Sequence, residues 1–160
     1  MEKTTRGTLK FVCYLTLVGI VIWVAFYAFQ SYYVLTTGSG PGVINWGSPR
    51  MGLKLTVFVA NRVTILLMAG LMAAFVVNIL KYLRGGTIFN HTNVVLLWVM
   101  TIVVPIHSFI SDNMDIACSA TEHFDLVLTD TPIVYMVITL LVALLYKLAY
   151  DAAEEQKLTI

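Results

Sequence analysis

A long uncharged run near the N-terminus constrains the fold of this chain more than any other feature. It follows three basic side chains and continues from Phe11 past Tyr33 without an acidic or basic residue. A helix needs about 20 predominantly apolar residues to cross a bilayer. The run is too long for the apolar core of a secretory signal, which spans about 7–15 residues. The sequence therefore predicts an uncleaved first membrane span over residues 9–33.

The composition indicates a lipid environment for the rest of the chain as well. Of the 160 residues, 59% are hydrophobic and 12% are charged, and the mean hydropathy is +0.84. Soluble domains have about 45–50% apolar and about 25% charged residues, so this chain has too few charges to cover a soluble surface. Further apolar runs predict spans over residues 55–83, 93–110 and 132–150. We expect one all-α domain over residues 1–160, an integral-membrane four-helix transmembrane bundle that contacts the lipid bilayer.

The positions of lysine and arginine beside the spans predict the topology, because cytoplasmic loops carry an excess of these residues. Arg50 and Lys54 share one side with an all-acidic segment. Seven basic residues share the other side, namely Lys3, Arg6, Lys10, Lys81, Arg84, Lys147 and Lys157. This asymmetry predicts that both termini and the loop between the second and third spans are cytoplasmic.

The loop between the second and third spans, residues 83–93, is a short basic hinge. Gly85-Gly86 suits the positive φ that often ends a helix. Asn90 or Thr92 can cap the next helix, because their side chains accept hydrogen bonds from free backbone N–H groups. Later in the chain, Asp130-Thr131-Pro132 combines a cap residue with a proline in the first turn, which predicts the start of the last span.

Four polar residues form a candidate intramembrane polar site, namely Arg62, Asn78, His107 and Asp112. Ionisable residues at depth in a membrane tend to find partners or to serve a function. Arg62 either extends to the lipid headgroups or pairs with an outer carboxylate such as Asp112 or Asp115. His107 either makes an interhelical hydrogen bond or takes part in proton-linked or metal chemistry.

Small residues and a proline bear on how the spans pack. Gly70 and Ala74 form a small-xxx-small pair, with Asn78 one turn beyond, and such pairs let helix backbones approach closely. The pair serves either packing within this chain or the seam of a homo-oligomer. Pro105 is expected to kink the third span.

The segment after the third span is acidic and lacks lysine and arginine. Its carboxylates and its histidine are Asp112, Asp115, Glu122, His123, Asp125 and Asp130. Divalent cations take such ligands, but the spacing fits no established pattern, and a solvated acidic face or salt bridges explain it as well. Cys13 and Cys118 form no CxxC pair, so Cys118 is either an ordinary small side chain or a reactive thiol. We predict no metal, no cofactor and no catalytic residue.

Two short patches carry a family resemblance. In the hinge, Gly86, Phe89, Asn90 and Asn93 follow a pattern of glycine, spacer, Phe, polar residue and an Asn that opens the third span. The chain then ends in an acidic stretch and Leu-Thr-Ile, that is, Glu154, Glu155, Leu158, Thr159 and Ile160. In these patches and in hydropathy the chain resembles domain-of-unknown-function family 2975, short four-span bacterial membrane proteins. The resemblance implies a small helix-turn-helix regulator as a partner, since members are commonly encoded beside one, and implies no catalytic residues.

Together these features predict a non-enzymatic regulatory or accessory protein that acts with a small cytoplasmic partner and does not itself bind nucleic acid. The candidate contact residues are Arg84, Phe89, Asn90, Asn93, Leu158, Thr159 and Ile160. Phe89 either docks the partner or enters the lipid interface and fixes the third span. The alternative function is a small transporter, channel or immunity-type membrane protein, although transport usually needs a buried ionisable site and the spans hold no buried acid.

Overall fold

Five α-helices make up the described part of the chain. The computed structural model describes residues 3–37, 49–83, 88–118 and 125–158. The helices are α1 (Lys3–Thr37), α2 (Met51–Leu83), α3 (His91–Asp112), α4 (Met114–Cys118) and α5 (Thr131–Leu158). Four of them are long and apolar enough to cross a membrane, and α4 is a short helix between α3 and α5. The predicted all-α, four-span architecture is confirmed.

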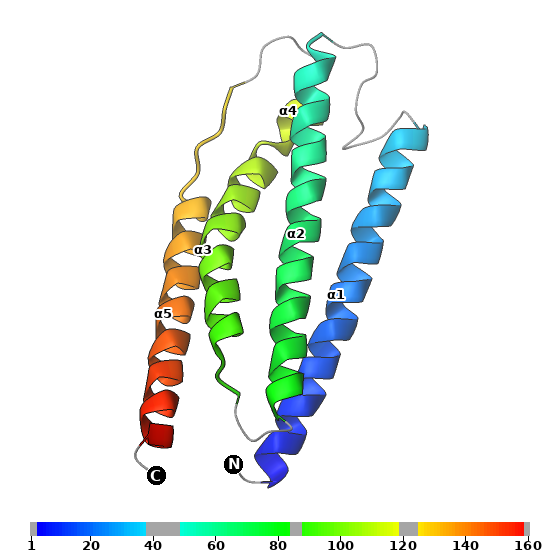
Figure 1. Cartoon of the computed structure of the whole chain (residues 1–160). Helices are drawn as coiled ribbons and strands as arrows, with labels where there is room; N and C mark the ends of the chain where they lie inside the picture. The colour runs from blue at the N-terminus through cyan, green and yellow to red at the C-terminus, as the bar shows by residue number, and fades with distance from the viewer. Residues whose placement is uncertain (1–2, 38–48, 84–87, 119–124, 159–160) are drawn as a thin grey trace.

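The four long helices stand side by side in the order α1, α2, α3 and α5 (Figure 1). Within the described ranges the backbone of α1 comes close only to that of α2, and the backbone of α5 comes close only to that of α3. The short α4 packs on α2 and α3. Both chain ends lie at one end of the bundle, which we call the terminal end, and α4 lies towards the opposite, distal end (Figure 1). The arrangement leaves the two outer helices covered on one side only.

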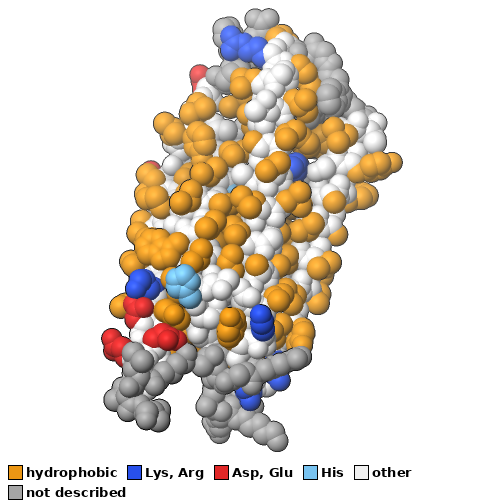
Figure 2. All heavy atoms as spheres, viewed as in Figure 1, with side chains coloured by type: hydrophobic (Ala, Val, Ile, Leu, Met, Phe, Trp, Pro, Cys, Tyr) orange, Lys and Arg blue, Asp and Glu red, His pale blue; other side chains and the backbone are white. Residues whose placement is uncertain are grey.

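The uncovered faces of the long helices are apolar. Phe11 on α1 is 68% exposed and Leu148 on α5 is 65% exposed, and hydrophobic side chains are spread along the whole length of the helices on the face shown in Figure 2. Water does not stabilise apolar surface of this extent. Lipid chains do stabilise such a surface. A helix can lie in lipid because the backbone groups inside it are already hydrogen-bonded to one another. The chain is thus a multi-pass membrane protein whose helices contact lipid directly.

A small apolar cluster ties the distal end together. Val34 of α1, Phe58 of α2 and Ala117 of α4 are buried against one another. Met51 and Met114 pack around them. The cluster holds α4 against α1 and α2 near the distal end of the bundle.

All four long helices are longer than the predicted spans. α2 begins at Met51 rather than near residue 55, and α5 continues to Leu158 rather than ending near Tyr150. Hydropathy marks where lipid contact stops, whereas a helix stops only where its backbone conformation or capping changes. The residues that follow Tyr150 include Ala, Glu and Gln, which favour helix, so α5 projects past its apolar part.

The start of α3 follows the predicted capping. The Asn90 side chain accepts a hydrogen bond from the Asn93 backbone N–H at 2.9 Å, which satisfies a donor that has no partner inside the helix. The start of α5 follows Asp130 as predicted, and the Asp130 carbonyl accepts from the Val134 N–H at 3.0 Å. Pro105 lies inside α3, which continues on both sides of it.

Tyr146 of α5 locks the described part of the hinge onto α5 at the terminal end. Its hydroxyl donates to the Ile88 carbonyl at 2.8 Å. The Phe89 ring meets the Tyr146 ring edge-on at 5.3 Å between centroids, and Phe75 of α2 meets it at 5.6 Å. Edge-to-face pairs of this kind contribute about 0.5–1.5 kcal/mol beyond their buried area. One tyrosine therefore joins α2, the hinge and α5.

We predict that Tyr146→Phe lowers the free energy of unfolding in detergent by about 1 kcal/mol, because it removes one hydrogen bond and keeps the ring. The matched control is Tyr135→Phe, since the Tyr135 side chain of the same helix is 46% exposed. Thermal unfolding of the purified variants measures both. Equal losses for the two variants, or no loss for Tyr146→Phe, would contradict the proposed lock.

Candidate functional site

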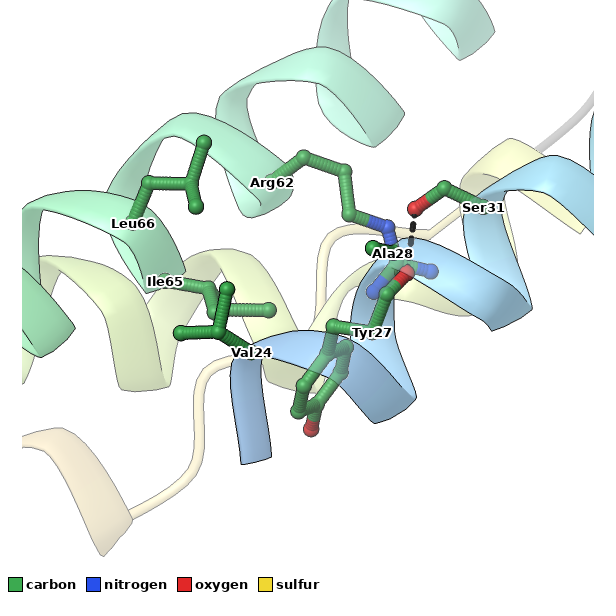
Figure 3. A pocket seen from close by; sticks show the side chains of 7 residues that line it. All are labelled: Val24, Tyr27, Ala28, Ser31, Arg62, Ile65 and Leu66. Carbon is green, nitrogen blue, oxygen red and sulfur yellow. Dashed lines mark hydrogen bonds between the residues drawn. The ribbon is translucent and has the colours of Figure 1, made fainter. Parts of the chain in front are cut away.

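Arg62 lies in the seam between α1 and α2 (Figure 3). Its guanidinium carbon is 4.8 Å from the centroid of the Phe58 ring and 5.1 Å from that of the Tyr27 ring. Nη2 donates to Gln30 Oε1 across the seam at 3.1 Å. A guanidinium above an aromatic face is attracted by the negative face of the ring. Two rings and one amide thus hold this cation between the helices.

Two nitrogens of Arg62 remain without a hydrogen-bond acceptor. Nε and Nη1 are buried and have no partner among the described residues. Within the same ranges no acid forms an ion pair with Arg62, so one of the two predicted alternatives, the pairing with Asp112 or Asp115, is not found there. An unsatisfied donor costs about 1–3 kcal/mol, and more when it is charged. An oxygen atom of a ligand that accepted hydrogen bonds from these nitrogens would therefore stabilise the site.

Two hollows meet at Arg62. The first, of about 110 Å³, lies between α1 and α2 and has almost entirely apolar walls, including Val24, Ile65 and Leu66. Figure 3 shows these side chains to the left of the guanidinium along the seam. The second, of about 250 Å³, is lined by Arg62 and Asp115 together with Gln30, Asn61, Ser111 and Cys118. An apolar groove and a polar hollow thus adjoin at one cation.

The depth of Arg62 follows from helix length. About 28 Å of helix separates Arg62 from Lys81 at a rise of about 1.5 Å per residue. About 30 Å separates Gln30 from Lys10 on α1 by the same measure. The hydrocarbon core of a bilayer is about 30 Å thick. If the lysines mark one surface of that core, Arg62 and Gln30 mark the other.

His107 of α3 meets α2 through a hydroxyl. Its Nδ1 lies 2.9 Å from Thr64 Oγ1, a hydrogen bond in which either atom can donate, depending on the tautomer. The predicted interhelical hydrogen bond of His107 is therefore found. Thr64 is two residues from Arg62 on α2, so a polar layer crosses the bundle at this level.

Asp112 is engaged at the end of α3. Its carboxylate accepts a hydrogen bond from the Thr129 hydroxyl. Beside it, Asn113 clamps the segment that leads to α5: its Nδ2 donates to the Phe109 and Val127 carbonyls, both at 2.9 Å, and its Oδ1 accepts from the Val127 N–H at 2.8 Å. Asn113 was not among the candidate residues, although a polar amide directly after the end of a helix is a signal that the sequence contains.

Asn78 does not join the other polar residues. It is half-buried on α2, and about 24 Å of helix separates it from Arg62 at about 1.5 Å per residue. Gly70 lies between them, and a Cβ placed there would meet no atom within 4 Å. No neighbouring helix of the described chain therefore uses Gly70 as a contact point. The homo-oligomer seam stays a prediction.

The hinge residues among the candidate contacts are turned into the bundle. Asn93 is fully buried, and its Nδ2 donates to the Phe75 carbonyl at 3.3 Å. Asn90 is 6% exposed, and Phe89 packs on Tyr146. The remaining candidates, Arg84, Thr159, Ile160 and the side chain of Leu158, lie outside the described residues. Asn90 and Asn93 thus shape the corner rather than present their own side chains.

Cys118 is half-buried at the end of α4. Burial raises the pKa of its thiol, the Asp115 carboxylate raises it further, and Arg62 partly offsets the rise. A raised pKa keeps the thiol protonated near neutral pH, which disfavours a nucleophilic role. In the described ranges no three His, Cys, Asp or Glu side chains gather as a metal site would require.

Comparison with protein-family models, with curated protein sequences and with solved structures finds no match to this chain. The fold and the polar layer define its class, a four-helix multi-pass membrane protein. The resemblance to domain-of-unknown-function family 2975 rests on the hinge and tail residues and stays a prediction.

The Thr64–His107 contact is testable by a double-mutant cycle. We predict that Thr64→Val and His107→Leu are coupled by about 0.6 kcal/mol, the average for such pairs inside membranes. The matched control is Thr56→Val on the same helix, whose hydroxyl donates to the Gly52 carbonyl at 2.8 Å. Thermal or denaturant unfolding of the four variants gives the coupling energy. Coupling as large for Thr56 as for Thr64 would contradict the contact.

Proposed function

We propose that this chain is a non-enzymatic regulatory or accessory protein of the bacterial inner membrane, with both termini in the cytoplasm. It acts by binding a small cytoplasmic partner at the terminal end of the bundle. The resemblance implies that this partner is a small helix-turn-helix regulator. The lysines beside the spans support the orientation, since Lys10, Lys81 and Lys147 all lie in the terminal half of their helices.

One observation carries the proposal: the described part of the hinge lies beside α5 at the terminal end of the bundle. The Tyr146–Ile88 hydrogen bond joins positions 58 residues apart in the sequence. The His91 ring at the start of α3 meets the Tyr150 ring at 6.2 Å between centroids. The described part of the hinge therefore lies against α5 shortly before the tail patch, which begins at Glu154, at one end of the molecule.

The end of α5 suits a partner in water. Beyond Lys147 the helix continues for about 16 Å to Leu158, at about 1.5 Å per residue. Lys147 and Asp151 form an ion pair at 2.6 Å on this part, and Glu155 and Gln156 are exposed. Charged residues of this kind are stable outside lipid. We infer that the projecting turns of α5 form the contact, while Phe89 and Asn93 hold those turns in place.

Site-specific photocrosslinking tests this contact. A photoreactive residue at Gln156 is expected to crosslink to a co-expressed small helix-turn-helix regulator, because Gln156 is exposed on the projecting turns. The matched control is Leu128, which is 78% exposed near the distal end. Crosslinking at Gln156 should fall in a Phe89→Ala background, which removes the ring against Tyr146. Equal yields at Gln156 and Leu128, or none at either, would sink the proposal.

A small transporter or channel is the second candidate, because a hollow of about 340 Å³ adjoins the polar layer. His107, Ser108, Ser111 and Asp112 line it together with Tyr135 of α5. This function predicts ion or solute flux into proteoliposomes that His107→Ala reduces and Thr139→Val, a change elsewhere on α5, leaves unaltered. Proteoliposomes without flux above protein-free vesicles, over a panel of ions including protons, would exclude this candidate.

A further inference from the structure

The hollow beside Arg62 contains a cation and an anion that do not neutralise each other. Arg62 and Asp115 both line it, yet their side chains form no ion pair within 4 Å. The Arg62 guanidinium keeps two nitrogens without an acceptor. Asp115 lies on α4, one turn beyond the end of α3, and is exposed. Opposite charges that face one cavity without meeting are complementary to a ligand that carries both charges.

The adjoining groove indicates what else that ligand contains. The walls between α1 and α2 below Arg62 are apolar, with Val24, Ile65 and Leu66 along them. The groove opens onto the exposed face of these helices, which lipid chains cover. A ligand that reaches Arg62 along it has an apolar chain attached to its charged part.

The position of Arg62 along α2 places the site at the depth of a lipid headgroup. Arg62 stands about 28 Å of helix from Lys81 at about 1.5 Å per residue, close to the thickness of the hydrocarbon core. The phosphates of a lipid leaflet lie just outside that core. Asp115 is farther out than Arg62, because α4 follows the distal end of α3 (Figure 1).

We propose that the α1–α2–α4 junction is a binding site for a zwitterionic phospholipid with a primary ammonium, phosphatidylethanolamine. One acyl chain lies in the groove along Leu66. The phosphate accepts hydrogen bonds from Arg62, whose guanidinium turns above the Tyr27 and Phe58 rings to reach it. The ammonium donates to the Asp115 carboxylate. Charge-assisted hydrogen bonds of this type are the stronger ones in proteins.

Native mass spectrometry of the full chain in mild detergent tests the site. The probes are phosphatidylethanolamine and phosphatidylglycerol with identical acyl chains. We expect phosphatidylethanolamine to bind about tenfold more tightly, because Asp115 attracts the ammonium and repels a net anionic lipid. Asp115→Asn, a change at an exposed position, should abolish this preference. Arg62→Gln should weaken the binding of both lipids by about tenfold or more.

Two further variants complete the test: one fills the groove, and the other removes a charge elsewhere as a control. Leu66→Trp fills the groove and should weaken both lipids without changing their ratio. Lys147→Gln removes a positive charge on α5, outside the junction, and should change neither affinity. Tighter binding of phosphatidylglycerol, an unchanged preference in Asp115→Asn, or binding by Arg62→Gln equal to the unaltered chain would overturn the proposal. Soluble phosphoethanolamine that competes as well as the whole lipid would overturn the role of the groove.

Discussion

The length of apolar helix between two levels of polar side chains determines which parts of the molecule lie in lipid. Lys10 and Lys81 lie near one end of α1 and α2, and Gln30 and Arg62 lie about 28–30 Å along them at about 1.5 Å per residue. Lipid accepts no charge between these levels without a partner. Segments beyond these two levels can therefore carry polar side chains. These segments are α4 at the distal end and the projecting turns of α5 at the terminal end.

The fold class was predictable from the sequence, but the arrangement of the helices was not. Long uncharged runs specify spans because lipid imposes length and apolarity. The same runs are apolar on all faces, so they do not indicate which face meets a neighbour. The order α1, α2, α3, α5 and the seat of α4 on Phe58 therefore appear only in the structure. The Asn90 cap was predictable because it depends on residues three positions apart.

The same distinction applies to the candidate site. Arg62 and His107 stood out in the sequence because each is an isolated ionisable residue within an apolar run. Most of their contacts did not stand out, since Tyr27 and Gln30, which meet Arg62, belong to α1 and depend on how the two helices are rotated. Phe58 lies one turn from Arg62 on α2 itself. Tyr146 was missed for the same reason, because one tyrosine among eight carries no local signal. We propose different roles for the two ends of the molecule: binding of a lipid headgroup at the distal end and contact with a protein partner at the terminal end.

A depth profile of spin labels on α1 and α2 tests the central claim most directly. Single labels at exposed positions, in a background with Cys13 and Cys118 replaced, report collision with oxygen in lipid and with a nickel chelate in water. The levels described above predict maximal lipid depth at Val21 and open access to water at Gly52, two turns or more beyond Arg62. A label at Gly52 as deep in lipid as one at Val21 would contradict the account, because Arg62 would then lie well inside the hydrocarbon core rather than at its boundary.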